Sequence, residues 1–253
     1  MSAPAPRDAP TGAPWLAGLD GCRTGWVVAF VRPDGAGAHV RIASRFADVL
    51  TAPEAPAIVA VDMPIGLPDR IGPDGRGPER AIRPLLGARQ SSVFPVPPRA
   101  AIYAADFAAA CAAALAASEP PRKVSKQLFM IAPKIREVDE CLRANPALAG
   151  RVYEVHPELA FWRLNGGRAL DEPKKVKGVC YEPGLALRRR LLVAAGLAEE
   201  VVMAAPPKGA GADDLLDALA CAAITLRLQA GTAKSFPESP GRDAFGLPVA
   251  IWA

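Results

Sequence analysis

The chain has 253 residues, enough for one large α/β domain or two small ones, and its 51% hydrophobic and 22% charged residues are typical of a soluble globular protein. The formal net charge of +4 permits nucleic-acid binding but lacks the excess expected of a dedicated binder. Five scattered cysteines without a CxxC pair argue against a disulfide framework or a zinc site and favour a reducing, cytoplasmic location: Cys22, Cys111, Cys141, Cys180 and Cys221.

Residues 1–14 are mostly Ala, Pro and Gly and contain no apolar signal-peptide core, which predicts a disordered tail. The Ala-rich segment 100–117 contains Asp106 and is too weakly apolar for a membrane span. We therefore expect no membrane association. We expect residues 15–253 to form a single domain with an insertion around residues 67–145.

The first apolar runs predict an antiparallel meander. Trp15–Leu19 and Trp26–Val31 are predicted strands on either side of a glycine turn, and His39–Ser44 alternates as a third strand before a short helix at Phe46–Leu50. Asp20 lies between the first two runs. A buried carboxylate is costly unless it is paired or bound to metal, so Asp20 is a candidate metal ligand. An ordinary role in a tight turn is the alternative.

The run Ala57–Val61 is apolar throughout, which is typical of a strand buried on both faces. Asp62 follows it at the edge where open α/β sheets build their sites. The long segment Leu67–Pro98 is rich in Pro, Gly and Arg, and such connections are usually functional. We expect it to determine substrate specificity.

Two helices are predicted next, at Arg99–Ala117 and at Val124–Ala144, with a break near Pro133. The second helix carries cations that suit a phosphate-bearing substrate, although a solvated helix face is the alternative. Together with an arginine at the tip of the first turn, the candidate substrate-binding residues are Arg23, Lys126, Lys134 and Arg136.

A predicted strand at Arg151–Val155 carries Glu154 and leads into His156. Glu154 is a candidate further metal ligand. His156 is a candidate general base or phosphate contact, with a structural hydrogen bond as the alternative. The following stretches predict helices at Leu159–Leu164 and Pro183–Leu197 and short strands at Val201–Met203 and Leu247–Trp252.

Ala212–Leu228 has the clearest helical pattern, and it contains Asp213, Asp214 and Asp217. Residues three or four apart share a helix face, so Asp217 can join either of the other two aspartates. Capping of the helix by Asp213 or Asp214 is the alternative, but it does not account for Asp217. Carboxylates are the ligands that Mg²⁺ and Mn²⁺ prefer, and two such ions about 4 Å apart can clamp a phosphoryl transfer.

The order of these features resembles the RNase H-like fold. GLDGCRTGW is similar to the first-strand motif of the RuvC-type Holliday junction resolvases and their YqgF relatives, and DDLLDALA is similar to their last helix. The resemblance implies a mixed five-stranded α/β sheet of order 3-2-1-4-5, with strand 2 antiparallel. It also implies catalytic, metal-binding carboxylates at Asp20, Asp62, Asp214 and Asp217. Asp62 departs from RuvC, which has Glu there.

A closer resemblance covers nearly the whole chain after the tail. The motifs GLDGCRTGW, VDMPIGLP, SSVFPVPPR, KQLFMIAPKIREVDE, YEVHPELAFW and DDLLDALA together resemble the domain of unknown function 429 family, described as predicted RNase H-like nucleases. Glu154 and His156 lie in one of these family motifs.

We therefore expect a nuclease or other phosphodiester hydrolase that uses two Mg²⁺ or Mn²⁺ ions, acting on nucleic acid or a related phosphodiester. One alternative is an ATP-binding module related to actin and Hsp70, although those proteins need a second copy of the domain. Another alternative is a domain that binds nucleic acid or protein without catalysis. RuvC-like resolvases act as dimers, so a homodimer is possible by resemblance.

Overall fold

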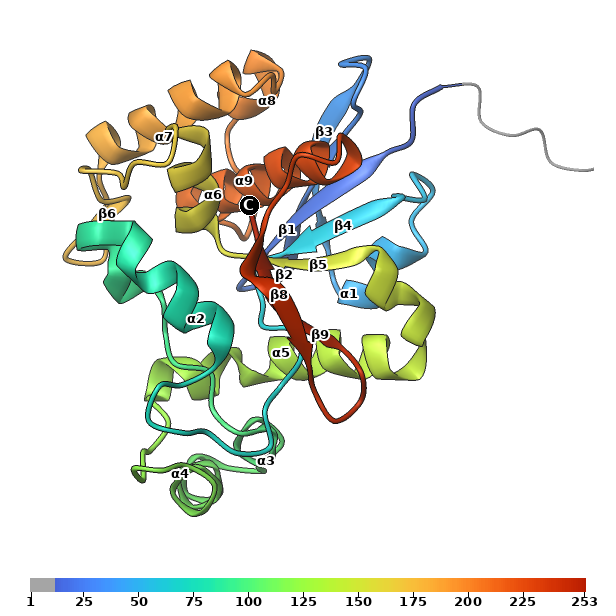
Figure 1. Cartoon of the computed structure of the whole chain (residues 1–253). Helices are drawn as coiled ribbons and strands as arrows, with labels where there is room; N and C mark the ends of the chain where they lie inside the picture. Colours follow the sequence, from blue (N-terminus) through green and yellow to red (C-terminus); the bar gives the residue numbers. More distant parts are fainter. Residues whose placement is uncertain (1–11) are drawn as a thin grey trace, which may run out of the picture.

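The computed structural model describes residues 12–253 of the chain, and most of the predicted disordered tail lies outside the described residues (Figure 1). The core is a seven-stranded mixed sheet of order β3-β2-β1-β4-β5-β9-β8. Its strands are β1 (Leu16–Cys22), β2 (Gly25–Val31), β3 (Ala38–Ala43), β4 (Ile58–Val61), β5 (Val152–Val155), β8 (Ser235–Arg242) and β9 (Pro248–Trp252).

The predicted order of the first five strands is confirmed, with β2 antiparallel to β1 and β3, and with β1, β4 and β5 parallel. The prediction of five strands was wrong because the C-terminal hairpin continues the sheet. β9 pairs in parallel with β5, and β8 pairs with β9. The sequence of β8, SFPESPGR, has no apolar alternation and contains two prolines, which are tolerated in an edge strand.

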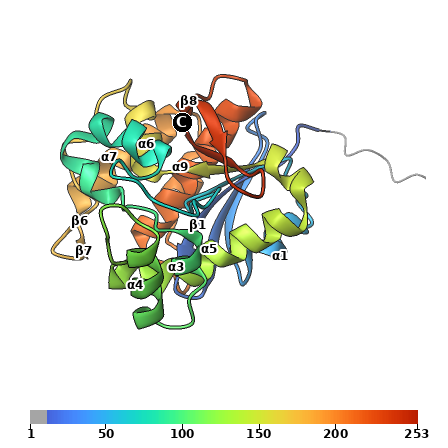
Figure 2. The ribbon, with the colours of Figure 1, turned by 60° about the horizontal axis from the view of Figure 1, so that its bottom comes forward.

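Helices cover both faces of this sheet (Figures 1 and 2). One hydrophobic cluster joins the sheet to α6 (Pro157–Leu164), α7 (Glu182–Ala194) and α9 (Ala212–Gln229). The other joins the opposite face to α1 (Phe46–Leu50), α4 (Phe107–Ala116) and α5 (Lys126–Ala144). Strand residues alternate between the two clusters, so Leu16 belongs to the first and Ala17 and Leu19 to the second.

The predicted insertion contains α2 (Gly77–Ile82), the 3₁₀ segment η1 (Arg83–Ser92), α3 (Arg99–Ile102), α4 and α5. The predicted helix at 99–117 is in fact two helices. Asp106 separates them because its side chain accepts a hydrogen bond from Ala109 N at 2.8 Å and caps α4. The break predicted near Pro133 is absent, and α5 runs through this exposed proline.

The 3₁₀ turn η2 (Pro146–Gly150) precedes β5. After β5, the chain forms α6 and then a small hairpin of β6 (Lys175–Val176) and β7 (Val179–Cys180). The helices α7, α8 (Glu199–Val202) and α9 follow. The strand predicted at 201–203 was wrong. Glu199 and Glu200 begin a helical turn there, where acidic side chains are favoured by the helix dipole. Within the described residues, no helix is both long and apolar enough to cross a membrane.

Candidate functional site: a buried carboxylate cluster

Asp20 and Asp62 lie side by side on neighbouring parallel strands. Leu19 of β1 pairs with Val61, the last residue of β4. Asp20 is the next residue of β1, and Asp62 is the first residue after β4. Asp62 N donates a hydrogen bond to Leu19 O at 3.0 Å, which fixes this alignment. Asp20 is buried and accepts a hydrogen bond from Gly21 N at 2.7 Å. By strand alternation, both side chains belong to the face of the sheet that α9 covers.

A close approach between β1 and α9 brings Asp217 to the same place. A Cβ built on Gly18 would lie 2.3 Å from Ala218 O and 2.0 Å from Ala222 N, so only a glycine permits this contact. Asp217 directly precedes Ala218 on the helix and is 3% exposed. The apolar strands and the small residues of α9 therefore position three acids that are far apart in the sequence.

Asp217 perturbs the ionisation of Asp20 and Asp62, and Asp62 perturbs that of Asp20. Burial raises the pKa of Asp20 well above its ordinary value, and repulsion from Asp217 and Asp62 adds to this effect. Burial and repulsion from Asp217 raise the pKa of Asp62 to about 8. The pKa of Asp217 is also raised by burial, although Lys174 opposes the shift. This repulsion places Asp20, Asp62 and Asp217 in one electrostatic environment.

The ammonium of Lys174 lies within this environment. Its Nζ donates to Asp217 Oδ2 in an ion pair, and the side chain is 29% exposed. Burial lowers the pKa of Lys174, but attraction to Asp217, Asp20 and Asp62 outweighs burial and leaves its pKa raised. Lys174 is therefore a cation that partly neutralises the cluster.

The donor chemistry of the cluster suits a hard divalent cation, because every candidate ligand is a carboxylate oxygen. Asp217 Oδ1 is buried and has no hydrogen-bond partner among the described residues, so one acceptor in the cluster is unused. In residues 12–253, however, no three acidic, His or Cys side chains are arranged closely enough to hold a metal ion. The residues fit a metal by chemistry, and the spacing seen here does not form a complete coordination shell.

Asp214 and Asp213, at the start of α9, have other partners. Asp214 Oδ2 accepts a hydrogen bond from Gly211 N at 2.8 Å, as a helix cap would. Asp213 forms an ion pair with Lys175 at 2.5 Å. Asp214 still contributes repulsion to Asp20, so it lies at the margin of the cluster.

Glu154 is close to the cluster but is held in a separate buried network. Its carboxylate forms an ion pair with Arg76 and accepts a hydrogen bond from Ile65 N at 2.8 Å. Arg76 also pairs with Glu79 at 2.6 Å and donates to Ile65 O at 2.7 Å. Burial raises the pKa of Glu154 to about 7, although Arg76 opposes the shift. These contacts attach the loop after β4 to β5.

His156 lies beside Asp62 and is neutral near pH 7, because burial lowers its pKa to about 4. Its Nε2 lies 3.4 Å from Ser92 O, whereas Nδ1 is buried and lacks a hydrogen-bond partner among the described residues. A cavity of about 20 Å³ is lined by Asp62, Glu154 and His156. This volume is sufficient for one water molecule.

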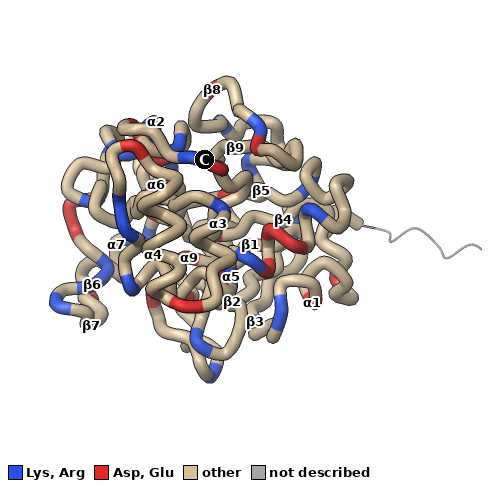
Figure 3. The backbone as a smooth tube through the Cα atoms, turned by 90° about the horizontal axis from the view of Figure 1, so that it is seen from below, with Lys and Arg blue, Asp and Glu red and all other residues tan. Residues whose placement is uncertain are grey.

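The four predicted substrate-binding cations have different surroundings. Arg23 and Lys126 are exposed, at the β1–β2 turn and at the start of α5. Lys134 Nζ donates to Gly25 O at 2.5 Å and lies over the Trp26 ring, and Asp20 is among the acids that act on its pKa. Arg136 donates to Ile102 O at 3.2 Å, which secures the end of α3. In the view of Figure 3, Lys and Arg are spread over several elements.

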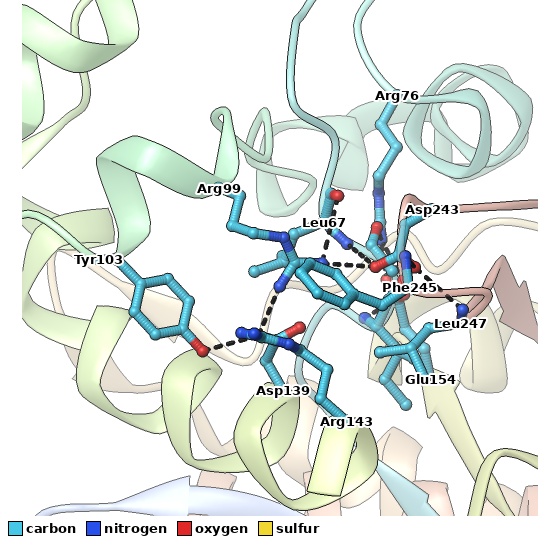
Figure 4. A network of polar contacts seen from close by, with 12 residues as sticks. Leu67, Arg76, Arg99, Tyr103, Asp139, Arg143, Glu154, Asp243, Phe245 and Leu247 are labelled. Atoms are coloured by element: carbon cyan, nitrogen blue, oxygen red, sulfur yellow. Dashed lines mark hydrogen bonds and ion pairs between the residues drawn. The ribbon is translucent and has the colours of Figure 1, made fainter. Parts of the chain in front are cut away.

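A second charged network ties the helical insertion to the C-terminal hairpin (Figure 4). Arg99 pairs with Asp139 of α5 and with Asp243 of the β8–β9 loop, both at 2.5 Å. The Phe245 ring lies against the guanidinium groups of Arg99 and Arg143, at 4.5 and 3.9 Å from the ring centroid. This network has a structural role, because it joins three segments that are distant in the sequence.

Sequence reasoning missed Lys174 and Glu158. Lys174 lies in the irregular stretch DEPKKVKGVC, which has no hydrophobic periodicity and no motif. Glu158 is buried at the start of α6, pairs with Arg188 at 2.5 Å, and raises the pKa of both Asp62 and Asp217. The one signal for Lys174 was chemical, since a cluster of buried acids requires a cation.

The fold and the site together define an α/β protein with a buried carboxylate cluster at the junction of β1, β4 and α9. A family model described as "Protein of unknown function (DUF429)" matches residues 18–242, and the chain belongs to this family. Comparison with curated proteins and with solved structures gave no match.

Proposed function

We propose that this protein is a nuclease or related phosphodiester hydrolase that depends on Mg²⁺ or Mn²⁺. The observation that carries the proposal is the cluster of Asp20, Asp62 and Asp217, which come from β1, the end of β4 and α9, with Asp217 raising the pKa of both Asp20 and Asp62. The proposal also rests on the resemblance of these positions to the carboxylates of RNase H-like nucleases.

A purely structural role does not account for the cluster. Burying several carboxylates costs free energy unless cations or hydrogen bonds compensate them. Capping explains Asp214 and an ion pair explains Asp213, but Asp217 lies one turn further into the helix, and its Oδ1 has no hydrogen-bond partner within the described part of the chain. The Lys174 ammonium is attracted by all three acids. Without further positive charge the raised pKa values favour protonation of the acids, and a divalent cation would supply the charge that keeps them ionised.

The residues suggest a division of roles. Asp20, Asp62 and Asp217 would hold the cation, which when bound activates water and stabilises charge on phosphate oxygens. His156 is neutral, and its Nδ1, which has no hydrogen-bond partner among the residues that the structure describes, is a proton acceptor; the cavity that His156 shares with Asp62 has room for one water. Lys134, whose ammonium lies at Gly25 O on the α5 side of the sheet, and the exposed Arg23 would attract the phosphate backbone.

The test is hydrolysis of single-stranded and double-stranded RNA and DNA, branched DNA and nucleotides by purified protein in Mn²⁺ or Mg²⁺, with EDTA as the blank. We expect Asp20→Asn to lower kcat/KM by more than about a hundredfold without unfolding the protein. Asp34→Asn, at the exposed turn between β2 and β3, is the matched control and should retain wild-type activity. The absence of cleavage with every substrate would refute the proposal, and nucleic-acid binding that EDTA leaves unchanged would favour a non-catalytic domain.

A further inference from the structure

Lys174 occupies a carboxylate oxygen that a metal ion would also use. Its ammonium pairs with Asp217 Oδ2 and is attracted by Asp20 and Asp62, so one cation interacts with all three acids. The other oxygen of Asp217, Oδ1, has no hydrogen-bond partner in residues 12–253. The carboxylate cluster therefore contains an internal cation, the Lys174 ammonium, bound to the Asp217 carboxylate.

The backbone that carries Lys174 is fixed. Lys174 O accepts a hydrogen bond from Tyr181 N at 2.9 Å, and Glu172 O accepts one from Arg188 Nη1 at 3.0 Å. Pro173 O lies so close to Gly184 that a Cβ there would be 1.8 Å from it. Because these contacts hold the base of the β6–β7 hairpin on α7, the ammonium can leave Asp217 by rotation of the lysine side chain alone.

Charge and geometry indicate what happens when a divalent cation enters. Two cations near one carboxylate repel each other, and a divalent ion is attracted to the three acids more strongly than an ammonium is. We propose that Lys174 is a built-in counter-cation that competes with a divalent cation for Asp217 and so sets the metal affinity of the cluster. This inference rests on the proposed function, because it concerns the same metal site.

The neighbouring Lys175 provides a matched control. It lies on the same segment and forms a 2.5 Å ion pair with Asp213 on the same helix. Its side chain is 41% exposed, however, and its partner is not one of the three clustered acids. Competition at the cluster should therefore depend on Lys174 and not on Lys175.

The first measurement is Mn²⁺ affinity by calorimetry at fixed pH and ionic strength. We expect Lys174→Gln to bind Mn²⁺ about tenfold more tightly than wild type, and Lys175→Gln to stay within about twofold of wild type. Adding Asp217→Asn to Lys174→Gln should abolish the gain. Equal or weaker binding by Lys174→Gln would overturn the inference.

The second measurement uses the wild-type protein, so it does not depend on the folding of a variant. Amine acetylation, read by mass spectrometry, reports how accessible each lysine is. We expect Mn²⁺ to raise the labelling rate of Lys174 severalfold and to leave Lys175 unchanged. A rate for Lys174 that stays the same or falls when Mn²⁺ binds would also overturn the inference.

The two proposals fail in different ways. If Lys174→Gln binds Mn²⁺ more tightly but no phosphodiester is cleaved, the counter-cation stands and the hydrolase is refuted. If the protein cleaves a substrate and Lys174→Gln binds Mn²⁺ no better than wild type, the hydrolase stands and the counter-cation is refuted. If neither protein binds Mn²⁺, both proposals are refuted.

Discussion

The contact between Gly18 and α9 is the clearest place to test how the site is assembled. In Gly18→Ala the new Cβ would lie 2.0 Å from Ala222 N, 2.3 Å from Ala218 O and 2.6 Å from Ala222 Cα. All three are backbone atoms, so relief requires β1 and α9 to move apart rather than a side chain to rotate. Overpacking of a core costs about 1–3 kcal/mol, and a clash with backbone belongs at or above the upper end.

We therefore expect Gly18→Ala to lose about 3 kcal/mol or more of unfolding free energy, measured by urea denaturation. At about 2–4 °C per kcal/mol for a chain of this size, Tm should fall by about 6–12 °C. Gly150→Ala is the control, because nothing lies within 4 Å of a Cβ there and the glycine does not have a positive φ. A loss below about 1 kcal/mol in Gly18→Ala would refute the packing argument.

Three further predictions concern charges. Asp62 has a pKa of about 8 in the folded protein against an ordinary 3.8, so its contribution to stability is present below about pH 4 and is lost as pH rises through 8. Without divalent ions, Asp62→Asn should therefore melt higher than wild type at about pH 9, with the advantage shrinking in acid; an equal or lower Tm at that pH would contradict this. Arg76→Met leaves the buried Glu154 and Glu79 without their cationic partner and should lower the free energy of unfolding in urea by about 3–5 kcal/mol. The control Arg80→Gln, at an exposed ion pair, should stay within about 0.5 kcal/mol of wild type. Similar losses in the two variants would argue against the buried network. Hydrogen bonding to Arg41 lowers the pKa of Glu54 from 4.5 to about 2. The free energy of unfolding of the wild type should therefore fall by up to about 1 kcal/mol as pH decreases across that range. An identical dependence of stability on acid pH in Glu54→Gln would refute the assignment.

The central part of the fold was predictable because its signals are local and strong. The runs before Asp20 and Asp62 are uninterrupted and apolar, and the helix of Asp217 has the clearest periodicity in the chain. Once two parallel strands and a covering helix are placed, strand alternation and helix spacing put their acids on one face. The convergence of Asp20, Asp62 and Asp217 could therefore be predicted without coordinates.

The remaining features depend on tertiary contacts that no sequence window contains. β8 is a strand because β9 pairs with it, not because SFPESPGR favours one. Lys174 is placed by the packing of Gly184 against Pro173, and its partner is 43 residues away. Glu154 was predicted as a metal ligand because it lies near the end of a strand expected beside the strand of Asp62, yet Arg76, which approaches from a distant loop, already pairs with it.

The spacing of the acids along the chain has a consequence for biosynthesis. Asp20 and Asp62 belong to the first quarter of the sequence, whereas Asp217 enters only with α9, which is one of the last elements of the fold. A chain still being translated has two of the three acids and lacks the helix that buries them. The cluster is therefore completed only after α9 has left the ribosome and packed against β1.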